Sequence, residues 1–460
     1  MHKRTFDQIF RTLIALPIGW ALFGIVSTIV YGVHFSVVSQ MVSLVLFAVT
    51  TLALFLANIT QRSLSKDSVL LGLAGLLFLT AICFVVDLSR ILTMTPDSSY
   101  LARFGQNIGL GNYEGSRLIF SMWGPLVPLM HSITNLLGQK LYWQYQPVLS
   151  FNLVAIVFYT VFNIMRKRKS ASQSAVAATA LVSLMALSNM FVFNVFYIHT
   201  NILSALYLYL LVFALAKIPH YPGIAYELLA FLSLIAFSLI RLEAPVFAVV
   251  VLLFASFRQD CSYVSRLKLI IPFVVLIAVW YARVYFLLPE RPDDLSLLTP
   301  PLAIVMIVAL VGFGLFAALS HLKMLDPIVS RTPSVTLGAL ALASIVLTLV
   351  KPGHMLTSLE GIVRNVLQGG EWGLTWYVVL AAITVLYFIR ESADERHWLC
   401  GVLIAYVLLV YNLAYASDPY RIGRHDSANR LMLQALPLVI LYLSHSLFAR
   451  IKSEKTAVEP

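Results

Sequence analysis

Long apolar runs alternate with short polar connections along almost the whole of this 460-residue chain. A run of about 20 apolar residues has the length that an α-helix needs to cross the hydrocarbon core of a bilayer. The pattern therefore predicts an all-α fold, a polytopic transmembrane helix bundle with about 14 spans and a range of 12–14. The predicted spans cover residues 13–31, 36–57, 69–86, 147–165, 174–194, 201–216, 224–240, 244–257, 268–288, 301–319, 335–350, 373–389, 398–415 and 430–448.

The composition agrees with a membrane protein. Hydrophobic residues make up 60% of the chain, charged residues 12%, and the mean hydropathy is +0.87. A soluble globular domain carries about 25% charged residues, so this chain lacks the polar surface that a soluble fold of its size needs. The three cysteines are too few for a disulfide scaffold, and no spacing of metal ligands is found in the sequence.

The distribution of Lys and Arg predicts the orientation of the spans. Basic residues concentrate in short loops such as the MRKRK run at 165–169, and these loops are expected on the cytoplasmic side. This predicts a multi-pass cytoplasmic (inner) membrane protein whose N- and C-termini, including the tail 451–460, are cytoplasmic. The net charge of +11 is mostly this topology signal, and its scatter over separate loops argues against a nucleic-acid partner. The long connections, above all residues 87–146 after the third predicted span, then lie outside.

The most polar segment of the chain, TPDSSYLARFGQNIGLGNYEG at 95–115, lies in this outer loop. Pro96 and Asp97 are typical of a helix start, with Asp97 or Ser98 as the N-cap. Apolar residues then recur at helical spacing, namely Leu101, Phe104 and Ile108, and Gly109 and Gly111 are expected to end the helix. A second amphipathic piece is predicted at 125–137. Both helices are expected to lie along the membrane surface with their apolar faces down.

The order of several motifs resembles the GT-C superfamily of membrane glycosyltransferases. The matching segments are PDSSYLARFGQNIGLG (96–111) and WGPLVPLM (123–130), with weaker similarity at 199–217, 238–245 and 427–443. Relatives of this kind include the protein O-mannosyltransferases, the lipid A aminoarabinose transferases and the arabinofuranosyltransferases. The chain departs from the usual pattern in having Ser98 where a second acid is common, and in placing its catalytic loop after the third span.

The resemblance implies an organisation and an activity. Residues 1–68 would be two additional N-terminal spans, and residues 69–450 would be the GT-C-like catalytic module. The implied activity is inverting transfer of a hexosyl or pentosyl group from a polyprenyl-phosphate carrier to a glycan, lipid or protein acceptor on the extracytoplasmic face. The implied cellular role is glycan biosynthesis in the cell envelope. No organic cofactor is expected, and the change at Ser98 leaves the use of a divalent metal open.

This chemistry needs a base for the acceptor hydroxyl and cations for the departing phosphate. Asp97 is the predicted general base, with Glu114 and Asp87 as the alternative carboxylates. Arginine binds phosphate bidentately, so arginines near the outer face are the expected phosphate ligands. The predicted substrate-binding residues are Tyr100, Arg103, Asn107, Glu114, Trp123, His199, Arg241, Glu243, Arg424 and Arg430.

Each candidate also has a purely structural interpretation. Asp97 could act only at a helix start, and Tyr100 and Trp123 could be interfacial aromatic residues. Arg241 and Glu243 could simply pair with each other, Arg430 could extend to the lipid headgroups, and His199 could be a hydrogen-bonded structural histidine.

Two other functions stay open at the level of sequence. One is a transporter or flippase of a lipid-linked substrate, which would carry charged or Gly/Pro-broken spans near the middle of the bilayer. The other is a polysaccharide polymerase or ligase, for which a long outer loop late in the chain would be typical. The sequence does not identify the sugar, the acceptor, the polyprenyl length or the oligomeric state.

Overall fold

The structure is a computed structural model that describes residues 3–31, 96–109, 120, 123–132, 145–167, 169–221, 224–258, 260–286, 300–388, 394–416 and 418–448. All regular secondary structure in these ranges is helical, as the hydropathy pattern predicts. The α-helices are α1 (Lys3–Tyr31), α4 (Pro96–Gly109), α6 (Leu126–Ser132), α8 (Tyr145–Arg166), α9 (Ala171–Ala186), α10 (Asn189–Phe196), α11 (Asn201–Lys217), α12 (Ile224–Ser238), α13 (Ala244–Ala255), α14 (Tyr263–Phe286), α15 (Pro300–Leu319), α16 (Asp326–Val350), α17 (Pro352–Arg364), α18 (Thr375–Phe388), α19 (Asp394–Leu413) and α20 (Ser427–Phe448).

Six helices of the described residues are long and apolar enough to cross a membrane. They lie at Gln146–Arg166, Tyr263–Phe286, Pro301–Leu319, Lys323–Val350, His397–Ala416 and Ser427–Leu447. Shorter apolar helices occupy other predicted spans, among them Leu13–Ile29 and Asn201–Lys217. The all-α fold is therefore confirmed within the described residues, and several of its helices could span a membrane, whereas the count of fourteen spans stays a prediction. The predicted spans at 36–57 and 69–86, and the boundary at residue 68, lie outside the described residues.

The predicted span 174–194 is not one straight helix. It divides into α9 and α10, whose axes differ by 73° across a break at Leu187 and Ser188. The Ser188 hydroxyl accepts a hydrogen bond from the Phe191 N–H at 3.1 Å, so it satisfies a free amide at the start of α10. Hydropathy does not register this break because the apolar residues continue on both sides of it.

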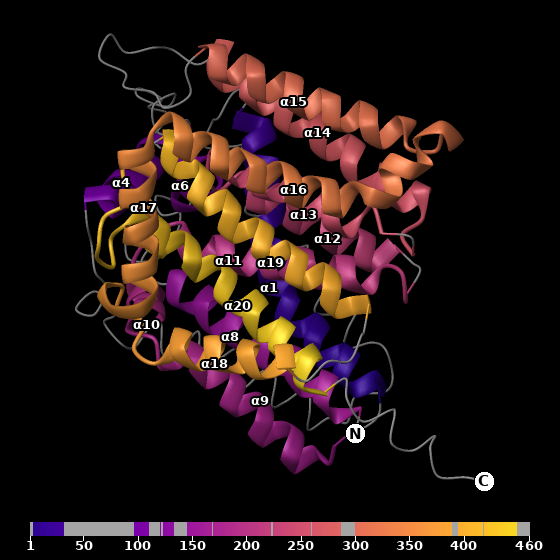
Figure 1. Cartoon of the computed structure of the whole chain (residues 1–460), viewed down its shortest axis with the longest axis vertical. Helices are drawn as coiled ribbons and strands as arrows, with labels where there is room; N and C mark the ends of the chain where they lie inside the picture. The colour runs from indigo at the N-terminus through magenta and orange to yellow at the C-terminus, as the bar shows by residue number, and fades with distance from the viewer. Residues whose placement is uncertain are drawn as a thin grey trace. The chain divides into compact units, whose positions relative to one another are not determined.

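The chain divides into two compact units. The first comprises Met1–Phe151 and Phe196–Ser330, and the second comprises Asn152–Val195 and Arg331–Pro460. Both units draw on distant parts of the sequence, and the division into residues 1–68 and 69–450 stays a prediction. In Figure 1, α14 and α15 of the first unit lie side by side, as do α19 and α20 of the second.

Helix α11 forms the centre of the first unit. Every residue from Asn201 to Leu215 is buried, which agrees with a sequence that is apolar on all sides. Helix α12 packs along it, and the Tyr207 hydroxyl donates to the Pro17 carbonyl of α1 at 2.9 Å. The core of this unit therefore surrounds α11 along its length, including the polar Asn201 at its start.

Helix α4 has the boundaries and the buried face that its sequence predicts. Leu101, Phe104 and Ile108 are at most 5% exposed, and α4 packs against α6. A Cβ atom on Gly105 would lie 2.4 Å from the Pro128 carbonyl oxygen, so the two helices approach at a distance that only glycine permits. The apolar face of α4 thus rests on protein.

Helix α6 differs from the prediction of a surface helix at 125–137. All seven of its residues from Leu126 to Ser132 are buried, including the polar His131. The Leu126 N–H donates to the Leu239 carbonyl at 3.0 Å. The apolar periodicity identified one buried face, but α4 on one side and α1 on another pack against α6 and bury its other residues as well.

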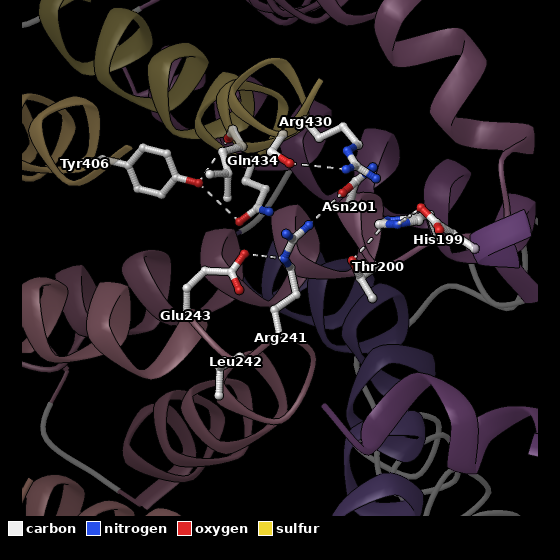
Figure 2. Close-up of polar contacts among 12 residues, drawn as sticks. His199, Thr200, Asn201, Arg241, Leu242, Glu243, Tyr406, Arg430 and Gln434 are labelled. Carbon is white, nitrogen blue, oxygen red and sulfur yellow. Dashed lines mark hydrogen bonds and ion pairs between the residues drawn. The ribbon is translucent and has the colours of Figure 1, made fainter. Parts of the chain in front are cut away.

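The second unit is organised around the N-terminal end of α20. Asn429 accepts a hydrogen bond from the Trp372 indole and donates to the Gly370 carbonyl at 3.0 Å. The Tyr406 hydroxyl of α19 donates to the Leu431 carbonyl at 3.0 Å and lies 3.1 Å from the Gln434 side-chain oxygen (Figure 2). These bonds fix the start of α20 and the chain that leads into it.

Candidate functional site

Asp97 lies next to His199 in the first unit, although the two residues are far apart in the sequence. The carboxylate Oδ2 is 3.8 Å from the imidazole Nε2, which is within reach of an ion pair but longer than a hydrogen bond. The Asp97 side chain is 40% exposed and that of His199 only 1%. The carboxylate is therefore partly exposed at the protein surface, and the imidazole next to it is buried.

Neighbouring residues hold both members of this pair. Helix α4 begins at Pro96, so Asp97 lies in its first turn and not at the N-cap that the sequence suggested. Ser98 is not the N-cap either, because its hydroxyl donates to the Ile198 carbonyl at 2.7 Å. This bond attaches the start of α4 to the segment that carries His199. A carboxylate in the first turn is also stabilised by the helix dipole.

The orientation of the His199 ring is set from two sides. Its Nδ1 is 3.1 Å from the Thr200 hydroxyl, and its ring stacks on Tyr197 with centroids 5.1 Å apart. With Nδ1 bonded to Thr200, the Nε2 atom is the one directed to Asp97. A carboxylate beside an oriented imidazole is an arrangement that can accept and share a proton.

The next residue along this segment, Asn201, connects the pair to a second ionic pair. Arg241 donates through Nε to the Glu243 carboxylate, and its Nη1 is 3.4 Å from the Asn201 side-chain oxygen (Figure 2). The side chains of Arg241 and Glu243 are 12% and 18% exposed. Figure 2 shows His199, Thr200 and Asn201 following one another, with Arg241 beside Asn201. Three consecutive residues thus connect the acid–imidazole pair to the arginine–glutamate pair.

The turn that carries Arg241 and Glu243 is itself well supported. It lies between α12 and α13, and the Tyr281 hydroxyl of α14 donates to the Leu242 carbonyl at 2.9 Å. The Ala244 N–H returns to the Arg241 carbonyl at 3.2 Å. The predicted pairing of Arg241 with Glu243 is confirmed, and both side chains are partly buried at the end of the α11–α12 core.

Tyr100 and Trp123 form an aromatic pair close to Asp97 along α4. Their ring centroids are 6.4 Å apart at an interplanar angle of 21°, and Tyr100 is 59% exposed. Gly124, which follows the tryptophan, has φ +69°, and a Cβ there would lie 2.4 Å from the Leu239 carbonyl oxygen. A glycine is therefore required directly after Trp123, where the backbone passes close to the Leu239 carbonyl. The exposed ring faces can stack on a sugar or sit at an interface.

The outward face of α4 continues with polar residues. Arg103 and Asn107 are exposed, one turn and two turns after Tyr100. These two side chains lie on the exposed face of α4, whereas Asp97, one turn before Leu101, lies at the start of the helix in line with its buried stripe. Glu114 and Asp87, the other carboxylates considered for the base, lie outside the described residues.

The second unit carries the other two predicted arginines, Arg424 and Arg430. The Arg424 guanidinium lies 4.7 Å from the centroid of the Phe193 ring and 3.4 Å from the Glu371 carboxylate. Glu371 has φ +60°, a conformation that a non-glycine residue adopts at a cost and that is concentrated at functional sites. Arg430 donates to the Ser427 hydroxyl at 3.3 Å (Figure 2).

A polar framework positions these arginines. Asp426 accepts hydrogen bonds from the Arg421 and Ala428 N–H groups at 2.7 and 2.8 Å. Asn365 donates to the Arg421 carbonyl at 2.7 Å from the first residue of a π-helical turn, Asn365–Gly369. Such turns are frequent at functional sites. The loop that precedes α20 is thus held by side chains and not by helix packing alone.

Sequence reasoning missed the residues that support the site, namely Ser98, Thr200, Asn201 and Tyr281. The signal for two of them was present: the triplet His-Thr-Asn at 199–201 opens an otherwise apolar run. Polar side chains at a buried helix start must be hydrogen-bonded, and a functional site is one reason to keep them there.

Metal ligands are not gathered in this part of the chain. Within the described ranges, no group of three or more His, Cys, Asp or Glu side chains is placed to hold a metal ion. Behind α4, burial lowers the pKa of His131 to about 3, so this imidazole is neutral at ordinary pH. The ionisable groups described at the site are therefore Asp97, Arg103, His199, Arg241 and Glu243 in the first unit.

Comparison with known proteins returned no family model, no curated protein and no solved structure that matches this chain.

Proposed function

We propose that this chain is an inverting membrane glycosyltransferase that moves a sugar from a polyprenyl-phosphate carrier to an acceptor on the extracytoplasmic face. The observation that carries the proposal is the half-exposed Asp97 carboxylate, fixed in the first turn of α4 beside the buried His199. The resemblance of residues 96–111 and 123–130 to GT-C enzymes gives the class of reaction.

In the proposed reaction, Asp97 takes the proton of an acceptor hydroxyl. The hydroxyl oxygen then forms a bond to the anomeric carbon of the sugar, and the bond from that carbon to the phosphate oxygen breaks. The electron pair leaves with the polyprenyl phosphate, and the anomeric configuration inverts. His199 acts as a positioning residue that holds the carboxylate and stabilises its charge through Nε2.

The other side chains have corresponding roles in the proposal. Tyr100 and Trp123 would stack on the sugar or the acceptor, and Arg103 and Asn107 would contact its polar groups. In the first unit, Arg241 would bind the carrier phosphate when the Glu243 carboxylate gives up part of its hydrogen bond with the arginine. In the second unit, Arg424 and Arg430 are separate candidates for binding phosphate.

The orientation of the site is a separate part of the proposal. The basic-residue bias puts residues 87–146 outside and the MRKRK run at 165–169 inside. Cysteine labelling at Asn112 and at Ser170, with an impermeant reagent on intact cells, measures this. Labelling at Ser170 without labelling at Asn112 would place the site in the wrong compartment.

A transporter or flippase of a lipid-linked substrate is the second candidate. The observation that favours it is the 73° break between α9 and α10, because discontinuous helices form the substrate sites of many transporters. A polysaccharide polymerase or ligase has no such specific support in the described residues.

One experiment separates the two. The purified chain in liposomes is given a panel of radiolabelled polyprenyl-phosphate sugars together with a membrane extract as the acceptor source. A transferase converts the label to a product that no longer partitions with the polyprenyl lipid and releases polyprenyl phosphate. A flippase leaves the lipid-linked sugar chemically intact and only changes its accessibility to a reagent added outside. Intact donor that becomes accessible would overturn the proposed transfer.

A further inference from the structure

A groove of about 260 Å³ lies among α1, α12 and α14 in the first unit. Its lining is almost entirely aliphatic and aromatic, with Thr28 and Arg283 as the polar members. The Thr28 hydroxyl is already used, since it donates to the Gly24 carbonyl at 2.7 Å. Arg283 is thus the one charged side chain in the lining.

The groove is placed to open into hydrocarbon. Helix α14 is long and apolar enough to cross a membrane, and α1 contributes the apolar stretch Leu13–Ile29. At the groove, Ile29 is 54% exposed and Val279 is 61% exposed. Apolar side chains of this size are exposed at a membrane span because lipid, and not water, surrounds them.

The two ends of the groove differ in chemistry. Arg283 lies in the last turn of α14, whereas Leu276 and Ile277 line the groove about two turns earlier in the span. The basic-residue bias places the Arg283 end of α14 at the outer surface, because Arg266 and Lys268 at its other end belong to the cytoplasmic side. An apolar groove that ends in a guanidinium at the depth of the lipid headgroups is complementary to a hydrocarbon chain that ends in an anionic group.

The size of the groove limits its occupant. Pockets that enclose a drug-sized molecule have volumes of about 300–1,000 Å³, so this groove is too small for a whole two-chain lipid. The groove can receive part of one hydrocarbon chain, while the rest of that chain, the headgroup and the second chain stay in the bilayer. A hydrocarbon chain held in this way would belong to the most abundant anionic lipids around the protein, the membrane phospholipids.

We propose that this groove binds one acyl chain of an anionic glycerophospholipid whose phosphate pairs with Arg283. This site is distinct from the Asp97 site, and it would bind lipid whether or not the chain transfers a sugar.

The groove also shares its walls with the candidate site. Leu239 lines the groove, and its carbonyl accepts the hydrogen bond from the Leu126 N–H at 3.0 Å. Trp280 lines it as well, and the adjacent Tyr281 donates to the Leu242 carbonyl at 2.9 Å. A bound chain would therefore steady the backbone from Leu239 to Leu242, which leads into the Arg241–Glu243 pair.

Photo-crosslinking tests the assignment directly. The probes are phosphatidylglycerol and phosphatidylcholine that carry a diazirine near the end of one acyl chain, each present at a low fraction in nanodiscs. Wild-type protein is expected to be labelled in the α14 peptide that contains Leu276 roughly five- to tenfold more by the anionic probe. Arg283→Gln should remove this preference and leave general labelling unchanged, while Arg364→Gln, another arginine in the last turn of a helix, should keep it.

The wild-type protein supplies an independent measurement if Arg283→Gln folds poorly. Unlabelled phosphatidylglycerol should compete with the probe, and unlabelled phosphatidylcholine should compete several-fold less. Equal labelling of the α14 peptide by both probes would overturn the proposal. So would stronger competition by a polyprenyl phosphate than by phosphatidylglycerol, because the occupant would then be a carrier lipid and not a phospholipid.

Discussion

The pairing of Arg241 with Glu243 allows a prediction that separates a structural role from a role in binding phosphate. Arg241→Gln removes a charge-assisted hydrogen bond between side chains that are only 12% and 18% exposed, and it leaves the Glu243 carboxylate partly buried. A hydrogen bond to a charged group contributes roughly 1.5–3 kcal/mol, so we expect a loss of about 2 kcal/mol. Glu243→Gln should cost less, because Arg241 keeps the Asn201 oxygen at 3.4 Å.

Thermal unfolding in a mild detergent measures these changes. An unfolding entropy of about 2.1 cal/mol/K per residue converts 2 kcal/mol into a fall in Tm of about 2–4 °C for a unit of this size. The double variant Arg241→Gln/Glu243→Gln should melt close to the better single variant, because two neutral amides replace the pair and no charge remains buried. Additive falls in Tm would refute the pairing as a stabilising contact.

Transfer activity of the same three proteins then decides the role of Arg241. If the arginine only supports the turn, the double variant regains activity together with stability. If it binds the carrier phosphate, the double variant regains stability and stays about one to two decades less active than the wild type, as expected for a lost charge-assisted bond. We expect the second result.

Three further predictions follow from the described contacts. Gly124→Ala should lower Tm by several degrees and reduce transfer, because φ +69° costs a non-glycine residue about 1–2 kcal/mol and the alanine Cβ would lie 2.4 Å from the Leu239 carbonyl oxygen. A melting curve equal to that of the wild type would contradict this. His131 should make the free energy of unfolding fall in acid, because its pKa is about 3 in the folded protein and 6.5 in the unfolded chain, which therefore binds an extra proton below pH 6.5. At pH 5 the wild type should have lost about 2 kcal/mol relative to His131→Gln, and parallel pH profiles of the two proteins would rule this out. Arg424→Gln should raise the KM for a polyprenyl-phosphate donor several-fold with little change in Tm, since the exposed bond of Arg424 to Glu371 contributes at most about 1 kcal/mol. An unchanged KM would mean that Arg424 does not bind the donor and only packs on the Phe193 ring.

The helix at 96–109 shows how far local sequence carries. Leu101, Phe104 and Ile108 share one helical face, and this spacing identifies both the helix and its buried side. The same logic identified α11 as an apolar helix, and the structure shows that it is buried on every side. In these elements the periodicity of the chain and its packing agree.

The same reasoning from residue spacing was wrong where the burial of a helix depends on which other helices pack against it. The spacing of Leu126, Leu129 and Met130 indicates one apolar face, but every residue of α6 is buried because α4 packs against it through Gly105 and α1 packs against it as well. The break between α9 and α10 was missed because long apolar runs continue on both sides of Ser188 and Asn189.

The candidate site was predicted as a set of residues and not as an arrangement. Asp97, His199 and Arg241 were each chosen for their residue type at a predicted outer span end. Their proximity depends on the fold of the first unit, which brings α4 to the segment 197–201 through the Ser98 hydroxyl. Sequence spacing carries no information on such a contact, whereas the polar triplet at 199–201 was a readable sign that one existed.

The most direct test of the central claim compares Asp97→Asn with the wild type in transfer of labelled sugar from a polyprenyl-phosphate donor. The matched control is Asp326→Asn, since Asp326 also lies in the first turn of a helix. Asparagine keeps the shape of the side chain at Asp97 and loses a helix-dipole contribution of about 0.3–1 kcal/mol together with a partly exposed ionic contact to His199 that contributes at most about 1 kcal/mol. Both variants should therefore melt within about 4 °C of the wild type. General-base catalysis contributes about 10²–10⁴-fold, so Asp97→Asn should transfer at least 100-fold more slowly while Asp326→Asn transfers normally. A folded Asp97→Asn protein with wild-type transfer would contradict the account, because the site described around His199 would then lack its base.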